Sequence, residues 1–234
     1  MARQTTALGL TGNQLKIIAL ILMTIDHVGA YLLPQYTVLR LVGRLSMPIF
    51  AWAIAEGCYY TKNRLRYLLT IAMFAAVCQV VYLIFLDSYY QCILVTFSLS
   101  ILMIYAVDLA SKKQNMLTLA LMGAVFCGIV YVCRFLPNDL PGLDYRIDYG
   151  LMGVLLPVLI YMGRNKSEKL LLAAVGLTAL ALTTNSSQWY AILSLPLLAL
   201  YNGKKGKMKL KYLFYLYYPL HLVAIYAISM LLNK

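Results

Sequence analysis

Long apolar runs separated by short polar connections recur along the whole chain. A helix needs roughly 20 apolar residues to cross the hydrocarbon core of a bilayer. By that measure we expect about nine spans, near residues 15–33, 38–60, 65–86, 92–108, 115–136, 150–162, 169–183, 189–201 and 211–232. The sixth and eighth are short, so we expect one or both to be tilted, extended by interfacial residues, or broken. The pattern predicts an all-α, polytopic transmembrane helical bundle and, because no internal repeat is visible, a single domain over residues 1–234.

The composition supports a lipid environment. Hydrophobic residues make up 62% of the 234 positions and charged residues 12%, whereas soluble domains carry roughly 25% charged residues. The first run is too long for the core of a signal peptide and carries Asp26 and His27 at its centre, so we interpret it as a span. None of the five cysteines belongs to a C-x-x-C pair, and the chain has only two histidines. We therefore expect neither a disulfide framework nor a metal site.

The placement of the basic residues, rather than the net charge of +12, indicates their role. They cluster in alternate short connections, which is typical of cytoplasmic loops beside an anionic leaflet, and no basic patch is interleaved with aromatics as in nucleic-acid binding proteins. We predict a cytoplasmic N-terminus, an outside C-terminus and a multi-pass location in the cytoplasmic (inner) membrane. The clustered residues are Arg3, Lys16, Lys62, Arg64, Arg66, Lys112, Lys113, Arg164, Lys166, Lys169, Lys204, Lys205, Lys207, Lys209 and Lys211.

Six of the ionisable residues inside the expected spans are the functional candidates, because an unpaired charge in lipid costs several kcal/mol. They are Asp26, His27, Arg40, Arg44, Glu56 and His221. At about 1.5 Å per residue, Asp26 and His27 lie roughly 17 Å from the cytoplasmic end of the first helix, and His221 about 15 Å along the last. Arg44 is about 9 Å below the outer end, a similar level in a core of ~30 Å. We expect these residues, with Arg40 one turn from Arg44, to converge, and Glu56 to belong with the Lys62–Arg66 connection instead.

Two interpretations of this convergence stay open at the level of sequence. Asp26 and Arg44 alone would form a structural ion pair between two helices, but that pair does not account for two histidines at the same depth. Pro219 and Tyr218 stand beside His221, so loosened backbone and hydroxyl groups are expected around that histidine. The Asp148-Tyr149-Gly150 turn before the sixth span either aims polar groups inward or caps a helix.

The same residues carry a resemblance to a known family. The motifs are Leu15-Lys16-Ile17-Ile18 with Ile25-Asp26-His27, Arg40-x-x-Gly43-Arg44-x-x-Met47-Pro48-Ile49-Phe50, Glu56-Gly57 with Thr61-Lys62-Asn63, Asp148-Tyr149-Gly150 with Gly153-Val154-Leu155-Leu156, and Lys211-Tyr212-x-Phe214-Tyr215-x-Tyr217-Tyr218-Pro219-x-His221-Leu222. In this order they resemble the TraX family of conjugal-transfer pilin acetylation proteins, which is distantly similar to the wider group of transmembrane acyltransferases. The resemblance implies a membrane acetyltransferase that uses cytoplasmic acetyl-CoA, and it does not identify the acceptor.

The implied chemistry assigns roles to the site residues. We expect His27 to act as general base toward an amine or hydroxyl acceptor on the outer side, with transient acetylation of His27 or His221 as the alternative. Asp26 is expected to position Arg40 or Arg44, and an arginine or a tyrosine such as Tyr218 to stabilise the oxyanion. The phosphates of acetyl-CoA are expected on the basic cytoplasmic connections. The candidate cofactor-binding residues are Lys62, Arg64, Arg66, Tyr149 and Lys211.

Two other classes of function use similar residues. A proton-coupled transporter or exporter also buries Asp, His and Arg, although nine spans without a visible inverted repeat do not fit the commonest transporter plans. An assembly or scaffold protein without chemistry would tolerate neutral substitutions at Asp26, His27 and Arg44 if the packing volume were kept. Thermal stabilisation of the solubilised protein by CoA distinguishes the enzyme from the transporter.

Overall fold

The computed structural model describes residues 9–207 and 211–232, without the side chains of Lys211, Tyr212, Phe214 and Tyr215. Arg3 and Lys209 of the basic clusters lie outside the described residues. The described elements are α1 Gly12–Tyr31, α2 Thr37–Gly43, α3 Ser46–Tyr60, α4 Arg64–Leu86, α5 Ile93–Lys113, α6 Met116–Val130, the π-helix η1 Tyr131–Phe135, α7 Leu136–Asp139, α8 Gly150–Met162, α9 Lys166–Thr183, the 3₁₀-helix η2 Ser186–Ser194, α10 Leu195–Ala199 and α11 Lys211–Leu232. Every element of this part of the chain is a helix, as the apolar pattern predicts.

Five helical stretches of the described chain are long and apolar enough to cross a membrane. They are Gly12–Tyr31, Thr37–Tyr60, Arg64–Leu86, Ile93–Lys113 and Met116–Asp139, and they coincide with the first five expected spans. The shorter apolar helices Gly150–Met162 and Leu216–Leu232 fall in the sixth and ninth. The multi-pass membrane character is thus confirmed, while the number of crossings and their orientation stay predictions.

The second expected span is interrupted, because α2 ends at Gly43 and α3 begins at Ser46. Pro48 lies four residues after Arg44 and has no N–H to donate to the Arg44 carbonyl, which favours a break in the helix at this point. The stretch Thr37–Tyr60 is nevertheless long and apolar enough to form one span, as expected over 38–60.

The eighth expected span, 189–201, is not an α-helical crossing. It consists of the end of η2 and the five-residue α10. A 3₁₀-helix rises about 2.0 Å per residue, against 1.5 Å in an α-helix, so η2 covers more of the bundle per residue than the apolar length suggests. Pro196 at the start of α10 suits the first turn of a helix.

Short capped connections arrange the long helices antiparallel to one another. Two or three residues separate α3 from α4, α5 from α6, and α8 from α9, which forces each pair to run in opposite directions. In each connection an asparagine side chain accepts a hydrogen bond from a backbone N–H of the next helix; the residues are Asn63, Asn115 and Asn165. The capping box expected at Thr11 and Gln14 is also present at the start of α1.

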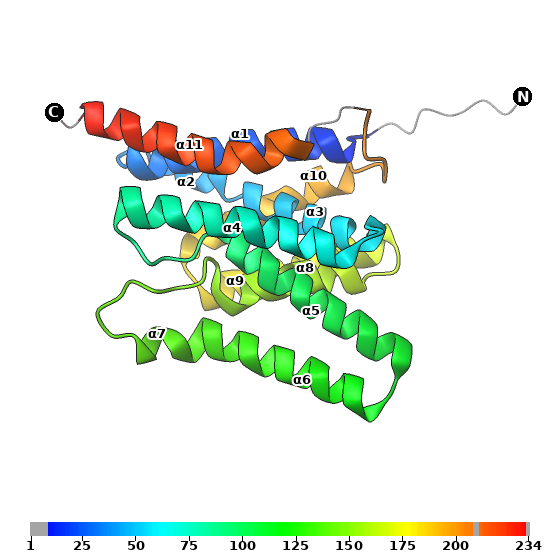
Figure 1. Ribbon diagram of the computed structural model, residues 1–234. Coiled ribbons are helices and arrows are strands. Elements are labelled where there is room, and N and C mark those ends of the chain that lie inside the picture. Colours follow the sequence, from blue (N-terminus) through cyan, green and yellow to red (C-terminus); the bar gives the residue numbers. More distant parts are fainter. Residues whose placement is uncertain (1–8, 208–210, 233–234) are drawn as a thin grey trace, which may run out of the picture.

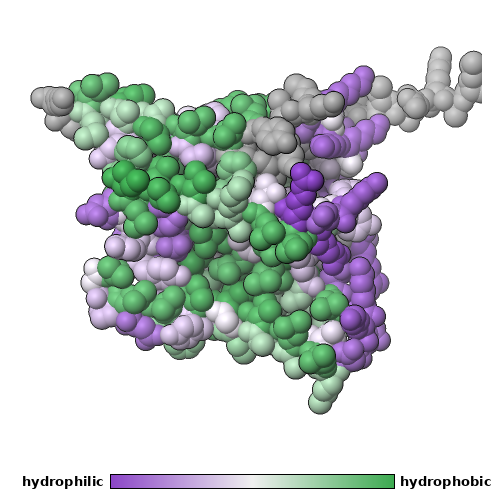
Figure 2. Space-filling view, viewed as in Figure 1, coloured by the Kyte–Doolittle hydropathy of each residue, from purple (hydrophilic) through white to green (hydrophobic). Residues whose placement is uncertain are grey.

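The layers of the bundle place α8 at its centre and α6 at its edge (Figure 1). The side chains of Val154, Leu156 and Ile160 on α8 are fully buried against α3, α5 and α9. On the opposite edge α11 packs against α1 and α4. Figure 2 shows apolar side chains across the middle of one face and the densest hydrophilic surface at the end where α5 joins α6. This distribution agrees with the basic connections gathering on one side of a membrane.

Candidate functional site

The centre of the site is the crossing of α1 and α2. Arg40 Nη1 lies 2.5 Å from Asp26 Oδ2 and donates to the Asp26 carbonyl oxygen at 3.1 Å. Two glycines allow the helices to come this close: a Cβ on Gly43 would overlap the Cβ of Asp26, and a Cβ on Gly29 would lie 2.7 Å from that of Leu39. The sequence left open which arginine Asp26 contacts, and the structure selects Arg40.

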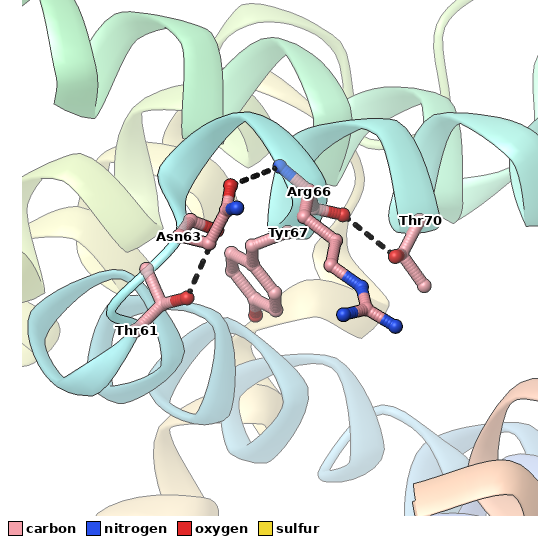
Figure 3. Close-up of a pocket in the computed structure, with 5 residues that line it drawn as sticks. All are labelled: Thr61, Asn63, Arg66, Tyr67 and Thr70. Atoms are coloured by element: carbon pink, nitrogen blue, oxygen red, sulfur yellow. Dashed lines mark hydrogen bonds between the residues drawn. The ribbon is translucent and has the colours of Figure 1, made fainter.

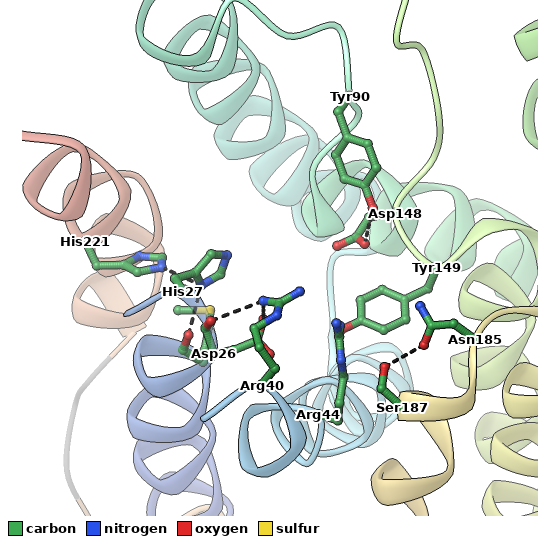
Figure 4. Close-up of polar contacts among 11 residues, drawn as sticks. Asp26, His27, Arg40, Arg44, Tyr90, Asp148, Tyr149, Asn185, Ser187 and His221 are labelled. Atoms are coloured by element: carbon green, nitrogen blue, oxygen red, sulfur yellow. Dashed lines mark hydrogen bonds and ion pairs between the residues drawn. The ribbon is translucent and has the colours of Figure 1, made fainter. Parts of the chain in front are cut away.

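The two histidines of the chain meet, as their depth predicted. His27 of α1 and His221 of α11 lie with ring centroids 4.9 Å apart and planes at 68°, and Nε2 of His221 is 3.3 Å from Nδ1 of His27 (Figure 4). Nδ1 of His27 also lies 2.9 Å from the carbonyl oxygen of Met23, and Nδ1 of His221 lies 3.0 Å from that of Tyr217. His221 is buried, whereas His27 is half-buried.

Tyrosines of α11 surround the histidine pair. Tyr217 stacks on His221 with ring centroids 5.4 Å apart, and its hydroxyl lies 2.7 Å from Oγ1 of Thr24, which ties α11 to α1. Tyr218 is buried and meets the rings of His221 and His27 edge-on, at 5.4 Å and 6.5 Å. The expected placement of Tyr218 beside His221 therefore holds, and the structure brings the same ring near His27 as well.

Arg44 faces the same region from the interruption between α2 and α3. Its Nη1 donates to the hydroxyl of Tyr149 at 3.4 Å, and its Nε is buried without a hydrogen-bond partner among the described residues. Figure 4 shows Arg40 lying between the histidine pair on one side and Arg44 with Tyr149 on the other. This N–H group is therefore available to donate to an acceptor other than the described residues.

Asp148 is a member of the site that the sequence analysis did not select. Its Oδ1 accepts a hydrogen bond from the Tyr90 hydroxyl at 2.6 Å, and its carbonyl accepts one from Thr96 at 2.8 Å. Burial raises the pKa of Asp148 to about 6, although the Tyr90 hydrogen bond and the charge of Arg44 oppose the shift. The charge of Asp26 raises the same pKa further, so the two carboxylates belong to one electrostatic environment.

The turn at Tyr149 resolves an alternative that the sequence left open. Tyr149 precedes α8 with a left-handed φ of 58°, followed by Gly150 at 56°, and makes no capping hydrogen bond through its side chain. Its ring instead reaches Arg44, so the turn aims polar groups inward. A Cβ on Gly153 would overlap Tyr149, which explains the small residue one turn into α8. Tyr149, expected with the cofactor-binding residues, thus lies beside Arg44.

Two connections clamp Asp148 in place. Gln91 and Ile147 form an isolated parallel bridge, in which the Asp148 N–H donates to the Gln91 carbonyl at 3.0 Å. Asp144 accepts hydrogen bonds from the Ser88 hydroxyl and from the Tyr89 N–H. The feature of the sequence that could have identified Asp148 as a site residue is its position before a Tyr-Gly turn at the start of an apolar run. Its role depends on a partner connection more than 50 residues earlier.

The basic residues expected to bind phosphate do not share one environment. Arg64 Nη1 pairs with Asp108 at 2.5 Å, whereas Lys62 is exposed and the side chain of Lys211 lies outside the described residues. Arg66 borders a pocket of about 230 Å³ at the start of α4, and Figure 3 shows its guanidinium extending away from the helix. The pocket is lined by Thr61, Asn63, Arg66, Tyr67 and Thr70.

Glu56 was expected to belong with the Lys62–Arg66 connection, and that assignment is wrong. Its Oε1 lies 2.5 Å from Nζ of Lys169 on α9, and its Oε2 accepts a hydrogen bond from the Tyr201 hydroxyl at 3.2 Å. The ammonium of Lys169 also lies over the ring of Tyr59, 5.3 Å from its centroid. Glu56 therefore links α3 to α9 instead of contributing to the site.

Comparison with known proteins places the chain in a family. It is 27% identical to the probable fimbrial assembly protein FimC, serogroup H1, of Dichelobacter nodosus, in an alignment that covers 94% of this chain and 96% of that protein. It is 46% identical to the uncharacterized protein RP591 of Rickettsia prowazekii (strain Madrid E) over 52 residues, 22% of this chain and 21% of that protein. No solved structure matches significantly. The family model described as TraX protein matches residues 11–229, and the chain therefore belongs to the TraX family.

Proposed function

We propose that the protein is a membrane-embedded acetyltransferase that moves acetyl from cytoplasmic acetyl-CoA to an amine or hydroxyl acceptor on the outer side. The observation that carries the proposal is the contact of His27 with His221 beside the Asp26–Arg40 pair. A bundle that needed only an ion pair would have no use for two neighbouring imidazoles in lipid. Membership of the TraX family, whose resemblance implies pilin acetylation, supports the same chemistry.

In this mechanism, His27 is the general base. It removes a proton from the acceptor nitrogen or oxygen as that atom attacks the thioester carbonyl carbon. The carbonyl oxygen becomes an oxyanion, which the guanidinium of Arg44 stabilises through its unused N–H. The C–S bond then breaks, and the sulfur leaves as CoA thiol with the proton that His27 returns. Asp26 forms an ion pair with Arg40 and so holds this second positive charge close to His27.

The donor has to reach this site from the cytoplasm. His27 is 15 residues from the start of α1 at Gly12, which is about 22 Å along the helix. The narrow pantetheine arm of CoA is the part of the donor that suits such a depth, while its phosphates stay at the basic end. The pocket beside Arg66 supports this arrangement because no described residue pairs with the Arg66 guanidinium and competes with an anion for it. Arg64, which pairs with Asp108, is a weaker candidate.

The acceptor is proposed by class only. A fimbrial assembly protein that aligns with nearly the whole chain supports a protein acceptor, such as the N-terminus of a pilin-like subunit. A cell-surface molecule with a hydroxyl group is the second class that the same site serves. Asp148, Tyr90 and the connections that clamp them lie on the predicted outer side, where such an acceptor enters.

Purified protein in nanodiscs, radiolabelled acetyl-CoA and an envelope extract as acceptor provide the test. We expect His27→Ala to lower transfer by about 10²–10⁴-fold, the usual contribution of a general base. Ile21→Ala, at an exposed position of the same helix, is the matched control and should retain full activity. Full transfer by the His27→Ala protein would refute the mechanism. Absence of both transfer and thermal stabilisation by CoA would favour the transporter.

A further inference from the structure

The two histidines are held in one arrangement of ring protons. A carbonyl oxygen can only accept a hydrogen bond, so a ring nitrogen that lies 2.9–3.0 Å from one has to carry a proton. Nδ1 of His27 faces the Met23 carbonyl and Nδ1 of His221 faces the Tyr217 carbonyl. Both contacts run to the residue four positions earlier in the same helix, so both rings are fixed as Nδ1–H tautomers by their own backbone.

This arrangement determines the direction of the contact between the rings. Because Nδ1 of His27 carries a proton, Nε2 of His221 at 3.3 Å has to be the acceptor. A proton on Nε2 of His221 would place two donors against each other. The pair therefore excludes a second proton on His221 while its ring keeps this position. Nε2 of His27 is left as the ring nitrogen whose lone pair no described residue occupies.

We propose that His221 is a positioning residue that acts through His27, and that Nε2 of His27 is the reacting atom of the pair. This inference rests on the proposed acetyl transfer and assigns its proton to one atom. The Nδ1–H of His27, shared between the Met23 carbonyl and His221, keeps the ring oriented. When Nε2 gains a proton the ring becomes an imidazolium, and its positive charge strengthens both hydrogen bonds of the Nδ1–H.

The proton follows a closed path. As the acceptor attacks the acetyl carbon, its proton moves to Nε2 of His27, which then carries protons on both nitrogens. When the C–S bond breaks, the Nε2 proton passes to the sulfur, and His27 returns to the Nδ1–H form. His221 keeps its single proton on Nδ1 throughout, and its lone pair accepts from His27 at every stage. Transient acetylation of His221 is thereby excluded, because its only lone pair is occupied.

The surroundings of the pair contain further charged and titratable groups that bear on any pH-dependent readout. On α1 these are Asp26 and Tyr31, on α2 Arg40, and on α11 Tyr217 and Tyr218. Arg44 and Asp148 lie beyond Arg40 (Figure 4). Since several of these groups can change their charge or position with pH, the test relies on chemical labelling and on conservative replacement instead of a pH profile.

Labelling with diethyl pyrocarbonate tests the free lone pair without any acetyl donor, because the reagent attacks unprotonated ring nitrogens. We expect mass spectrometry of the protein in nanodiscs to find modification at His27 clearly faster than at His221, because only His27 keeps a ring lone pair that no described residue occupies. His27→Ala should then make His221 reactive, because its Nε2 loses its donor. Equal labelling of both rings in the unaltered protein would overturn the proposal, even if no acetyl transfer were detected.

Conservative replacement separates positioning from direct chemistry. In His221→Gln the side-chain oxygen can accept from His27 near the place of Nε2, whereas His221→Leu has no acceptor. We expect the leucine variant to lower kcat roughly tenfold or more, with the KM for acetyl-CoA unchanged, and the glutamine variant to recover most of that loss. If both variants were as inactive as His27→Ala, His221 would take part in the chemistry itself and the positioning role would be wrong. The positioning role would also be wrong if the His221→Gln and His221→Leu proteins both transferred acetyl at the normal rate.

Discussion

Two acidic residues in this bundle, Glu56 and Asp26, each pair with a basic residue. They differ in whether the second carboxylate oxygen also has a hydrogen-bond partner. Glu56 places one carboxylate oxygen on Lys169 and the other on the Tyr201 hydroxyl, so both oxygens are satisfied. Asp26 pairs through Oδ2 with Arg40, while its Oδ1 is buried without a hydrogen-bond partner in the described chain. The first pair is complete as a structural link. The second lies beside Arg44, which also has an unused buried N–H.

The difference separates stability from function. Buried polar atoms without partners cost about 1–3 kcal/mol each, and native proteins keep few of them. Two such atoms lie near the α1–α2 crossing, beside a half-buried histidine whose Nε2 makes no hydrogen bond to a described residue, and the proposed acetyl transfer would use them to bind its substrate. At Glu56 both carboxylate oxygens already have partners, so this pair leaves no group for a ligand. Substitutions in the two regions should therefore affect different measurements.

The largest expected effect is on catalysis, at Arg44. Arg44→Gln removes the positive charge that we assign to the oxyanion, and we expect transfer to fall by about 10²–10³-fold, the usual loss when such a donor is removed. Because no described carboxylate forms a direct ion pair with Arg44, we expect its replacement to change the thermal midpoint less than it changes transfer. Single-turnover transfer of labelled acetyl and a melting curve measure the two quantities. Unchanged transfer would remove Arg44 from the mechanism.

The next largest effect is on stability, at Glu56. Glu56→Ala leaves Lys169 partly buried and unpaired, and removal of one partner from such a pair costs about 3–5 kcal/mol. We expect the thermal midpoint to fall clearly, while transfer per folded molecule stays normal. In the double variant Glu56→Ala with Lys169→Met, part of the loss should be recovered because no unpaired charge remains. A lower activity per folded molecule would place Glu56 in the site after all.

Much of this arrangement could be predicted from sequence, for identifiable reasons. Lengths of apolar runs located the first five spans, and counting along each helix brought His27 and His221 to the same level. The same counting cannot identify which residues pair. It did not decide whether Asp26 contacts Arg40 or Arg44, and it missed the pair that Glu56 forms with Lys169, 113 positions later. Asp148 was named only as part of a turn, because its position depends on the bridge between Gln91 and Ile147.

Smaller effects are expected where helices approach closely. Gly43→Ala places a methyl group against Asp26, and overpacking of this kind costs about 1–3 kcal/mol. Because the strain falls on Asp26 itself, transfer should fall together with the thermal midpoint. Gly128→Ala on α6 is the matched control, since nothing lies within 4 Å of its Cβ position. A glycine-to-alanine change inside a helix gains up to about 1 kcal/mol, so this variant should be slightly more stable and fully active. Equal effects of the two substitutions would contradict the close crossing.

The smallest effects concern two aspartates of one connection whose pKa values move in opposite directions. Burial raises the pKa of Asp148 to about 6 from an ordinary value of 3.8, so the folded protein binds more protons than the unfolded chain between these pH values. Stability from Asp148 is present below about pH 4 and lost as pH rises through 6. Asp148→Asn should therefore raise the thermal midpoint by a few degrees at pH 7.5 and leave it unchanged at pH 4.

Asp144 provides the opposite sign. Hydrogen bonds from the Ser88 hydroxyl and the Tyr89 N–H lower the pKa of Asp144, so its contribution is present above the ordinary value and lost as pH falls through the folded one. Asp144→Asn should lower the midpoint slightly at pH 7.5, with the difference shrinking in acid. Melting curves of both variants against pH in the same detergent measure the contrast. If both substitutions moved the midpoint in the same direction at pH 7.5, Asp148 would be a solvated residue of the connection, and its place beside Arg44 would carry no electrostatic consequence.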